Sequence, residues 1–256
     1  MRLLRLHRFK QEPSECAIAA CATVANHYNP KIDYEFAKKV TIKQVCRNTS
    51  EGLYSGQIGS LLNCLGFQKV RIVTSDLNIV DYSWAKLSTA KKVEAIQAML
   101  RSRSPSVDER DQLKHLLRFL TEEGCSNELV VDHLFKSHIE QALTEGKPVI
   151  LSYNWNMLWG IPKQDAHDTN DFVRGTFAMH AVCCRGFDSK AVDIVDSHHE
   201  FYKRKLKRLR NGYYTIPWDE LLTVMGSGDV IIPESYDEKA VYELVSENNK
   251  SVYLDD

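Results

Sequence analysis

The hydrophobic periodicity of this 256-residue chain changes once, close to Gly146, and the change restricts the folds that are open to it. Before Gly146, charged segments such as 88–102 and 108–123 repeat apolar residues at the spacing of amphipathic helices. After it, short apolar runs are separated by turn residues, as is typical of strands, with Asn211 and Gly212 as a hairpin turn. This order predicts an α+β fold in which an N-terminal helical half packs on a C-terminal antiparallel sheet.

One domain is expected to hold most of the chain. Its apolar content is high enough to bury a sizeable core, and no internal repeat or low-complexity segment interrupts it. We predict a single domain over residues 1–233 and a polar C-terminal tail over 234–256. Residues 85–140 are charged and amphipathic, and we predict a helical insertion there that packs beside the substrate cleft and restricts access to it. The last helix of this part of the chain is predicted over 126–146.

Cys16 stands at the leading edge of the small and apolar run "CAIAACATVANHY". The residues before it are Pro13, Ser14 and Glu15. They indicate a helix that begins at Cys16, with Ser14 as its N-cap. The unpaired N–H groups and the positive end of the helix dipole favour a thiolate at such a place, so Cys16 is a candidate nucleophile.

A partner base and its orienting acid can be placed on the predicted sheet. His180 lies at the start of the strand "MHAVCCRGF", and Asp196 ends the next strand, "AVDIVDS". Adjacent antiparallel strands joined by a tight turn would hold an imidazole and a carboxylate at a fixed separation, as general-base catalysis requires. The alternative interpretation is that His180 is a core histidine and Asp196 a turn aspartate. When these two residues are considered alone, that interpretation is favoured over a catalytic pair.

The order of a glutamine, a cysteine at a helix start, and a histidine and an aspartate on neighbouring strands resembles the papain-like cysteine peptidases. Among these thiol proteases, the chain is most similar to the double-glycine leader peptidases of bacteriocin exporters. The similarity is carried by "QEPSECAIAAC", "MHAVCCRGF", "VDIVDS", "SGQIGSLLNCLGF", "IEQALTEGKPVILSY" and "GYYTIPWDELL". It implies a hydrolase with Cys16 as nucleophile, His180 as base and Asp196 as the group that orients the imidazole. It also implies that the Gln11 amide and the Cys16 backbone N–H stabilise the oxyanion.

Three residues depart from the pattern of that family. Ala17 replaces the usual glycine after the cysteine. Gln11 lies five residues before Cys16, where the family has six, so its place in the oxyanion hole is an open point. Ser197 replaces the proline after the aspartate, a change that we expect to be harmless. The segment at 85–140 has no counterpart in the minimal peptidase domain, and we expect a peptidase without the transporter of that family.

Three further features have a functional and a structural interpretation. Trp155 and Trp159 follow a core strand, so they either line a substrate-binding cleft or form the edge of the core. The run at 203–210 carries six basic residues and could bind an acidic partner or nucleic acid, although a solvated hairpin arm is the simpler interpretation. Cys183 and Cys184 must point to opposite faces of a strand, which predicts core packing rather than a shared metal or redox site.

Composition limits the compartment and the partners. The formal net charge of -1 argues against a globally basic nucleic-acid-binding protein and leaves local basic patches open. The seven cysteines are odd in number and scattered, so we expect a reducing, cytoplasmic location, with delivery into another cell left open. No run is apolar enough for a signal-peptide core or a membrane span. No group of residues has a spacing diagnostic of zinc or calcium, so we expect no metal and no cofactor.

Three functions are compatible with these observations. The first is a cysteine peptidase that acts on a peptide or small protein tail, with cleavage after glycine implied by the resemblance. The second is an acyltransferase or transpeptidase on the same three residues, because phytochelatin synthases resemble this fold and pass the acyl group to an amine. The third is a catalytically silent adaptor that binds peptides, for which Ala17 and the short Gln11 spacing would be signs of decay. We expect the peptidase.

Overall fold

The computed structural model describes residues 3–102, 105–163, 170–171, 173–198, 211–226 and 228–242. The α-helices in this part of the chain are α1 (Cys16–Tyr28), α2 (Tyr34–Val40), α3 (Ser55–Cys64), α4 (Thr89–Ser102), α5 (Val107–Leu120), α6 (Phe135–Thr144), α7 (Trp155–Trp159) and α9 (Trp218–Val224). Two short helical turns of other types are η1 (Thr41–Val45) and η2 (Tyr82–Lys86). The strands are β1 (Leu65–Thr74), β2 (Glu128–Val131), β3 (Val149–Asn154), β4 (Met179–Phe187), β5 (Ala191–Val195), β6 (Tyr213–Pro217) and β7 (Asp229–Val241).

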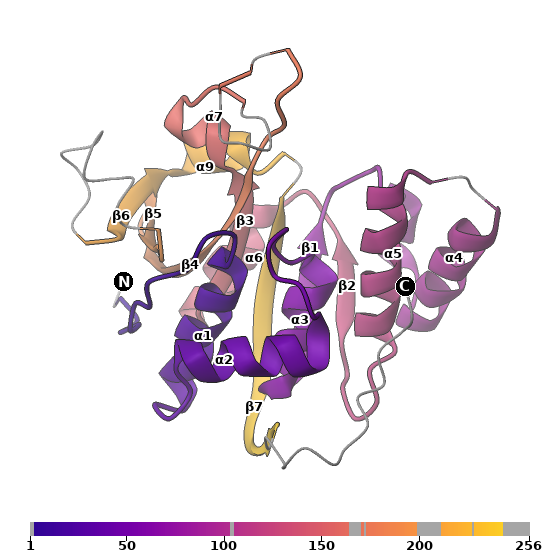
Figure 1. Cartoon of the computed structure of the whole chain (residues 1–256), viewed down its shortest axis with the longest axis horizontal. Coiled ribbons are helices and arrows are strands. Elements are labelled where there is room, and N and C mark those ends of the chain that lie inside the picture. The colour runs from indigo at the N-terminus through magenta and orange to yellow at the C-terminus, as the bar shows by residue number, and fades with distance from the viewer. Residues whose placement is uncertain are drawn as a thin grey trace.

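These strands form one seven-stranded sheet, in the order β2-β1-β7-β3-β4-β5-β6. The α+β class is confirmed. β7 pairs with β1 on one side and with β3 on the other, and it is the long yellow strand in the middle of Figure 1. The predicted C-terminal antiparallel sheet is present as β3 to β7, and the sheet also contains one parallel pair from the N-terminal half, β1 and β2. The connection between them contains α4 and α5, and a crossover of that length allows a parallel pair.

Hydrophobic clusters cover both faces of this sheet. One cluster joins α1, α2, α3 and α5 to the sheet, and these first three helices lie in front of it in Figure 1. A second cluster joins α6 and α9 to the sheet. Cys183 packs in the first cluster and Cys184 in the second, so the predicted alternation of the two thiols is confirmed.

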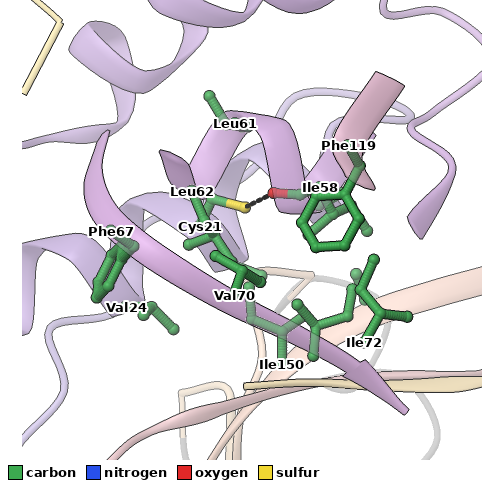
Figure 2. Close-up of a cluster of buried hydrophobic side chains, with 14 of the residues drawn as sticks. Cys21, Val24, Ile58, Leu61, Leu62, Phe67, Val70, Ile72, Phe119 and Ile150 are labelled. Carbon is green, nitrogen blue, oxygen red and sulfur yellow. Dashed lines mark hydrogen bonds between the residues drawn. The ribbon is translucent and has the colours of Figure 1, made fainter. Parts of the chain in front are cut away.

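α1 is buried within the first cluster, which keeps its first residue, Cys16, on a rigid element. The small side chains of α1 let β4 approach, and the Cys183 thiol donates to the Ala20 carbonyl at 3.2 Å. The Cys21 thiol faces the Ile58 carbonyl of α3 at 3.9 Å, as drawn in Figure 2. The other labelled side chains around this contact come from α1, α3, α5, β1 and β3: Val24, Leu61, Leu62, Phe67, Val70, Ile72, Phe119 and Ile150.

The region predicted as a helical insertion contains a strand as well as helices. The sequence predicts a helix over 126–146, whereas β2 occupies Glu128–Val131 and α6 begins only at Phe135. β2 alternates half-buried and buried side chains, and its two valines favour pairing with β1 over a helix. Phe119 and Leu129 are fully buried in the same cluster as α1. This region is therefore part of the core as well as part of the surface.

β7 continues past Pro233, where the sequence predicts the start of a polar tail. Residues 234–241 extend its pairing with β1, and Tyr236 lies opposite Phe67. The Tyr236 ring also stacks on Tyr28 of α1, with 5.2 Å between the centroids. These residues belong to the sheet.

Candidate active site

α1 begins at Cys16 as predicted, but the turn before it differs from the prediction. Ser14 is not the N-cap, because its φ of 62° places it in the left-handed region. Glu15 occupies the cap position and makes no capping bond with its side chain. Its N–H donates to the Glu12 carbonyl at 3.2 Å. The chain therefore reverses tightly just before the thiol.

The Glu15 side chain is used to anchor this turn instead. It is 5% exposed, accepts hydrogen bonds from the Tyr34 hydroxyl and from the Thr49 hydroxyl (2.9 Å), and pairs with Lys38 at 3.0 Å. Burial would raise the pKa of Glu15, but these three partners together hold it below its ordinary value. A charged and fully partnered carboxylate thus fixes the backbone that leads into Cys16.

β4 and β5 bring an imidazole and a carboxylate to Cys16. His180 is the second residue of β4, and Asp196 directly follows β5. Nε2 of His180 lies 2.9 Å from Oδ1 of Asp196, and both side chains are buried. The same imidazole is hydrogen-bonded to the Cys16 thiol. Since Nε2 faces Asp196, the contact with Cys16 falls to Nδ1.

Hydrogen bonds hold both carboxylate oxygens of Asp196. The Tyr214 hydroxyl donates to Oδ2 at 2.7 Å, and the His198 backbone N–H donates to Oδ1 at 2.8 Å. The hydroxyls of Tyr214 and Tyr153 are 2.9 Å apart. This buried network fixes the carboxylate and, through it, the orientation of the His180 imidazole.

The contact between Cys16 and His180 shifts both groups towards an ion pair. Burial would raise the pKa of Cys16, but the hydrogen bond and charge of His180 and a hydrogen bond from the Ala181 backbone lower it below its ordinary value. Burial would lower the pKa of His180, but the Asp196 carboxylate and Cys16 raise it to about 10. At neutral pH the arrangement favours a thiolate beside an imidazolium, the reactive form of a cysteine nucleophile.

Cys16 and His180 line an open cleft with a volume of about 1440 Å³. Another part of its lining comes from α5, including Asp111 and His115. The region at 85–140 therefore borders the cleft, as predicted, through α5.

The two candidate tryptophans occupy different places. Trp155 lines the cleft, and its ring centroid lies 4.5 Å from that of His180 in an edge-to-face contact. Trp159 packs against Trp155 and Tyr214, with centroid separations of 5.6 and 5.5 Å. Substrate binding by either ring stays a prediction.

Gln11 lies in the same cleft as Cys16. Its Oε1 accepts a hydrogen bond from the Ser197 hydroxyl at 2.6 Å. The structure thus brings Gln11 to the region of the thiol despite the short spacing, and its role in the oxyanion hole stays a prediction.

The residues that hold this site in place were missed by sequence reasoning. Tyr153 and Tyr214 resemble ordinary inward-facing strand residues, and Glu15 resembles a solvent-exposed residue of a turn. One usable signal exists: Tyr214 pairs opposite Ile194, and strand alternation puts it on the face of Asp196. Applying the hairpin register would have found it.

Within the part of the chain that the structure describes, the remaining predicted features give no second site. The basic run at 203–210 lies outside the described residues. Among the residues that are described, no group of three or more His, Cys, Asp or Glu side chains could hold a metal ion. Within the same ranges, no helix combines the length and apolarity needed to cross a membrane.

No protein-family model matches the sequence, and no curated protein matches it. Two solved structures are similar. A protein from Bacillus anthracis, described as a C39-like peptidase, is 12% identical with a TM-score of 0.46, and the match covers 93% of this chain and 100% of that one. Xylellain, a cysteine protease from Xylella fastidiosa, is 14% identical with a TM-score of 0.45, over 90% of this chain and 83% of that one. The structural neighbours are thus a C39-like peptidase and a cysteine protease.

Proposed function

We propose that this chain is a cysteine peptidase that cleaves a peptide or a small protein tail through a thioester on Cys16. One observation carries the proposal: the hydrogen-bonded series of Cys16, His180 and Asp196 meets an open cleft. A purely structural cysteine and histidine would be enclosed by the core. This pair faces the cleft and has opposite pKa shifts that favour its charged form, a combination typical of functional sites.

In the proposed reaction the Cys16 thiolate adds to the carbonyl carbon of the scissile peptide bond. The Gln11 amide and the Cys16 backbone N–H, at a helix start where such groups lack intrahelical partners, stabilise the oxyanion. The His180 imidazolium donates its proton to the leaving amine, the C–N bond breaks, and a thioester remains. Neutral His180 then takes a proton from the water that attacks the thioester, and the thiolate leaves. Asp196 orients the imidazole throughout.

The cleft supports a peptide as the substrate. Its volume of about 1440 Å³ exceeds the roughly 300–1,000 Å³ of typical small-molecule pockets. Trp155 lines the cleft, and its ring lies against the His180 imidazole. That bulk favours a small substrate residue at this point, so cleavage after glycine is included in the proposal.

A cytoplasmic location is part of the proposal as well. All seven cysteines are free thiols in the structure. Free thiols persist where glutathione and thioredoxin keep them reduced, and a nucleophilic Cys16 needs that protection.

The test is N-terminal profiling of a proteome treated with the purified protein. New N-termini that appear with the wild type and not with Cys16→Ala would reveal cleavage and the residue that precedes it. His180→Ala should lose nearly as much activity as Cys16→Ala, and Asp196→Asn should lose less. Combined substitutions should add little, because residues that act as one unit are strongly non-additive.

Two other outcomes would favour the alternative functions. New amide products that form only when an amine is added would indicate an acyltransferase. No product, together with slow alkylation of Cys16 by iodoacetamide, would indicate a silent peptide-binding adaptor.

A further inference from the structure

We propose that Ser197 is a positioning residue that turns the Gln11 amide N–H into the cleft, towards the oxyanion of the reaction. The inference rests on the proposed function, because an oxyanion forms only if Cys16 attacks an acyl group. The sequence presents Ser197 as a harmless replacement of proline, whereas the structure gives its hydroxyl a specific partner.

The geometry around the amide defines its direction. The Ser197 hydroxyl donates to Oε1 of Gln11 at 2.6 Å. Ser197 is 6% exposed, whereas Gln11 is partly exposed and lines the cleft together with Cys16. A primary amide carries its oxygen and its nitrogen on opposite sides of one planar carbon. Because a buried hydroxyl holds the oxygen, the Nε2 donors are turned away from the interior, to the cleft side.

The N-terminal segment that carries Gln11 also holds the backbone at Ser197. Arg8 donates from Nε to the Asp196 carbonyl at 2.5 Å and from Nη2 to the Ser197 carbonyl at 3.1 Å. Gly212 permits this approach, since a Cβ there would lie 2.2 Å from Nε of Arg8 and 2.4 Å from the Asp196 carbonyl oxygen. The Arg8 side chain thus joins the N-terminal segment to the backbone at Asp196 and Ser197, and the Ser197 hydroxyl adds the contact that directs the Gln11 amide.

The hydrogen bond between Ser197 and Gln11 compensates for the short spacing between Gln11 and Cys16. The family that the sequence resembles has six residues where this chain has five, so spacing alone does not orient the amide. The left-handed Ser14 tightens the turn between the two residues. The Ser197 hydroxyl then sets the direction of the side chain from a distant part of the chain.

Two thiol reagents distinguish an effect on oxyanion stabilisation from an effect on the Cys16 thiolate. Iodoacetamide alkylates Cys16 by displacement of iodide and forms no oxyanion. With p-nitrophenyl acetate, the thiolate adds to the ester carbonyl, p-nitrophenolate leaves, and an acetyl thioester of Cys16 remains. The rate of the p-nitrophenolate burst therefore reports oxyanion stabilisation, and the alkylation rate against pH reports the thiolate alone.

Ser197→Ala should slow the burst by about tenfold, because the Gln11 side chain regains the rotamer freedom that the hydroxyl removes. It should leave the rate and pH dependence of alkylation unchanged. Gln11→Ala, which loses the donor itself, should slow the burst by about 10²–10³. Ser197→Thr keeps the hydroxyl and should restore a burst close to that of the wild type. The Gln11→Ala/Ser197→Ala protein should be no slower than Gln11→Ala, because both changes act through one group.

The following outcomes would contradict either the positioning role of Ser197 or the proposed function. Equal bursts for the wild type and Ser197→Ala would overturn the positioning role, as would a further loss in the double variant. Slower alkylation of Ser197→Ala would show a general disturbance of the site and overturn the role as well. A wild type without a Cys16-dependent burst would instead overturn the proposed function, and this inference with it.

Discussion

The His180 imidazole favours the thiolate form of Cys16. Burial works against the thiolate, and His180 counters it with a hydrogen bond and a charge. Asp196 keeps that imidazole cationic through a 2.9 Å contact. The acidic thiol that the sequence predicts at the helix start thus has its cationic partner on β4, a distant part of the chain.

The pH dependence of alkylation measures this coupling. His180→Ala removes the cationic partner and the hydrogen-bond donor, so the pKa of Cys16 should rise and the midpoint of iodoacetamide alkylation should move to higher pH. His198→Ala is the matched control: it removes a second imidazole, whose ring centroid lies 6.1 Å from that of His180, and keeps the backbone N–H that donates to Asp196. If His198→Ala moves the midpoint and His180→Ala does not, His180 is the wrong base.

The turn before Cys16 has its own conformational requirement. Ser14 has a φ of 62°, where a β-branched side chain is strained and glycine is not. Ser14→Val should lower the free energy of unfolding by about 1–2 kcal/mol, and Ser14→Gly should change it little. Urea denaturation of the two variants gives the comparison. Equal stabilities would show that the turn adapts without cost.

At the scale of elements, the wall of the cleft is joined to the core by a close helix contact. Gly56 of α3 faces the backbone of α5, and a Cβ there would lie 2.5 Å from the His115 carbonyl carbon. Phe119, on the same helix, is fully buried. α5 therefore carries cleft residues on a helix whose other residues pack in the core, and removing the region at 85–140 would expose that core rather than only widen the cleft.

Gly56→Ala tests this contact. The added methyl group meets main chain that is held by two helices, so the variant should lose about 1–3 kcal/mol in urea denaturation. Gly226→Ala is the control: its nearest neighbour, the Thr223 carbonyl oxygen, would lie 3.8 Å from the new Cβ, and its stability should change by less than about 0.5 kcal/mol. Similar losses of stability in the two variants would mean that α3 and α5 move apart to accommodate the added methyl group.

At the scale of the whole molecule, β7 joins strands from the two halves of the chain into one sheet. It pairs with β1 from the N-terminal half and with β3 from the C-terminal half. The helix that bears Cys16 packs on one side of this sheet, and β4 supplies His180 from within it. The geometry of the site therefore depends on a strand that contributes neither of these residues.

Two truncations locate the end of the structural unit. A chain that ends at Tyr242 keeps every described contact of β7 and should unfold at the same urea concentration as the full chain. A chain that ends at Pro233 loses the pairing of residues 234–241 with β1 and the packing of Tyr236, and should lose about 3 kcal/mol or more. Equal urea midpoints for the two truncated chains would mean that residues 234–241 form a dispensable tail.

Local pattern predicted the order of most elements, and the family resemblance then singled out Cys16, His180 and Asp196 as candidate site residues. Helical spacing before Gly146 and alternation after it predicted the α+β order, and the residues before Cys16 predicted where α1 begins. His180 and Asp196 could be paired because neighbouring strands joined by a short turn have a limited set of registers. These inferences succeed because each depends on residues close in sequence.

Only the tertiary structure decided how the chain closes around that site. The insertion of β7 between β1 and β3, the parallel pairing of β2, and the contact of Ser197 with Gln11 all join residues that are far apart in sequence. No local periodicity, cap or turn encodes such partners, because burial and hydrogen-bond satisfaction are decided over the whole core. Glu15 is a further example. Its carboxylate does not cap the helix but binds Tyr34, Thr49 and Lys38, which only folding brings close to it.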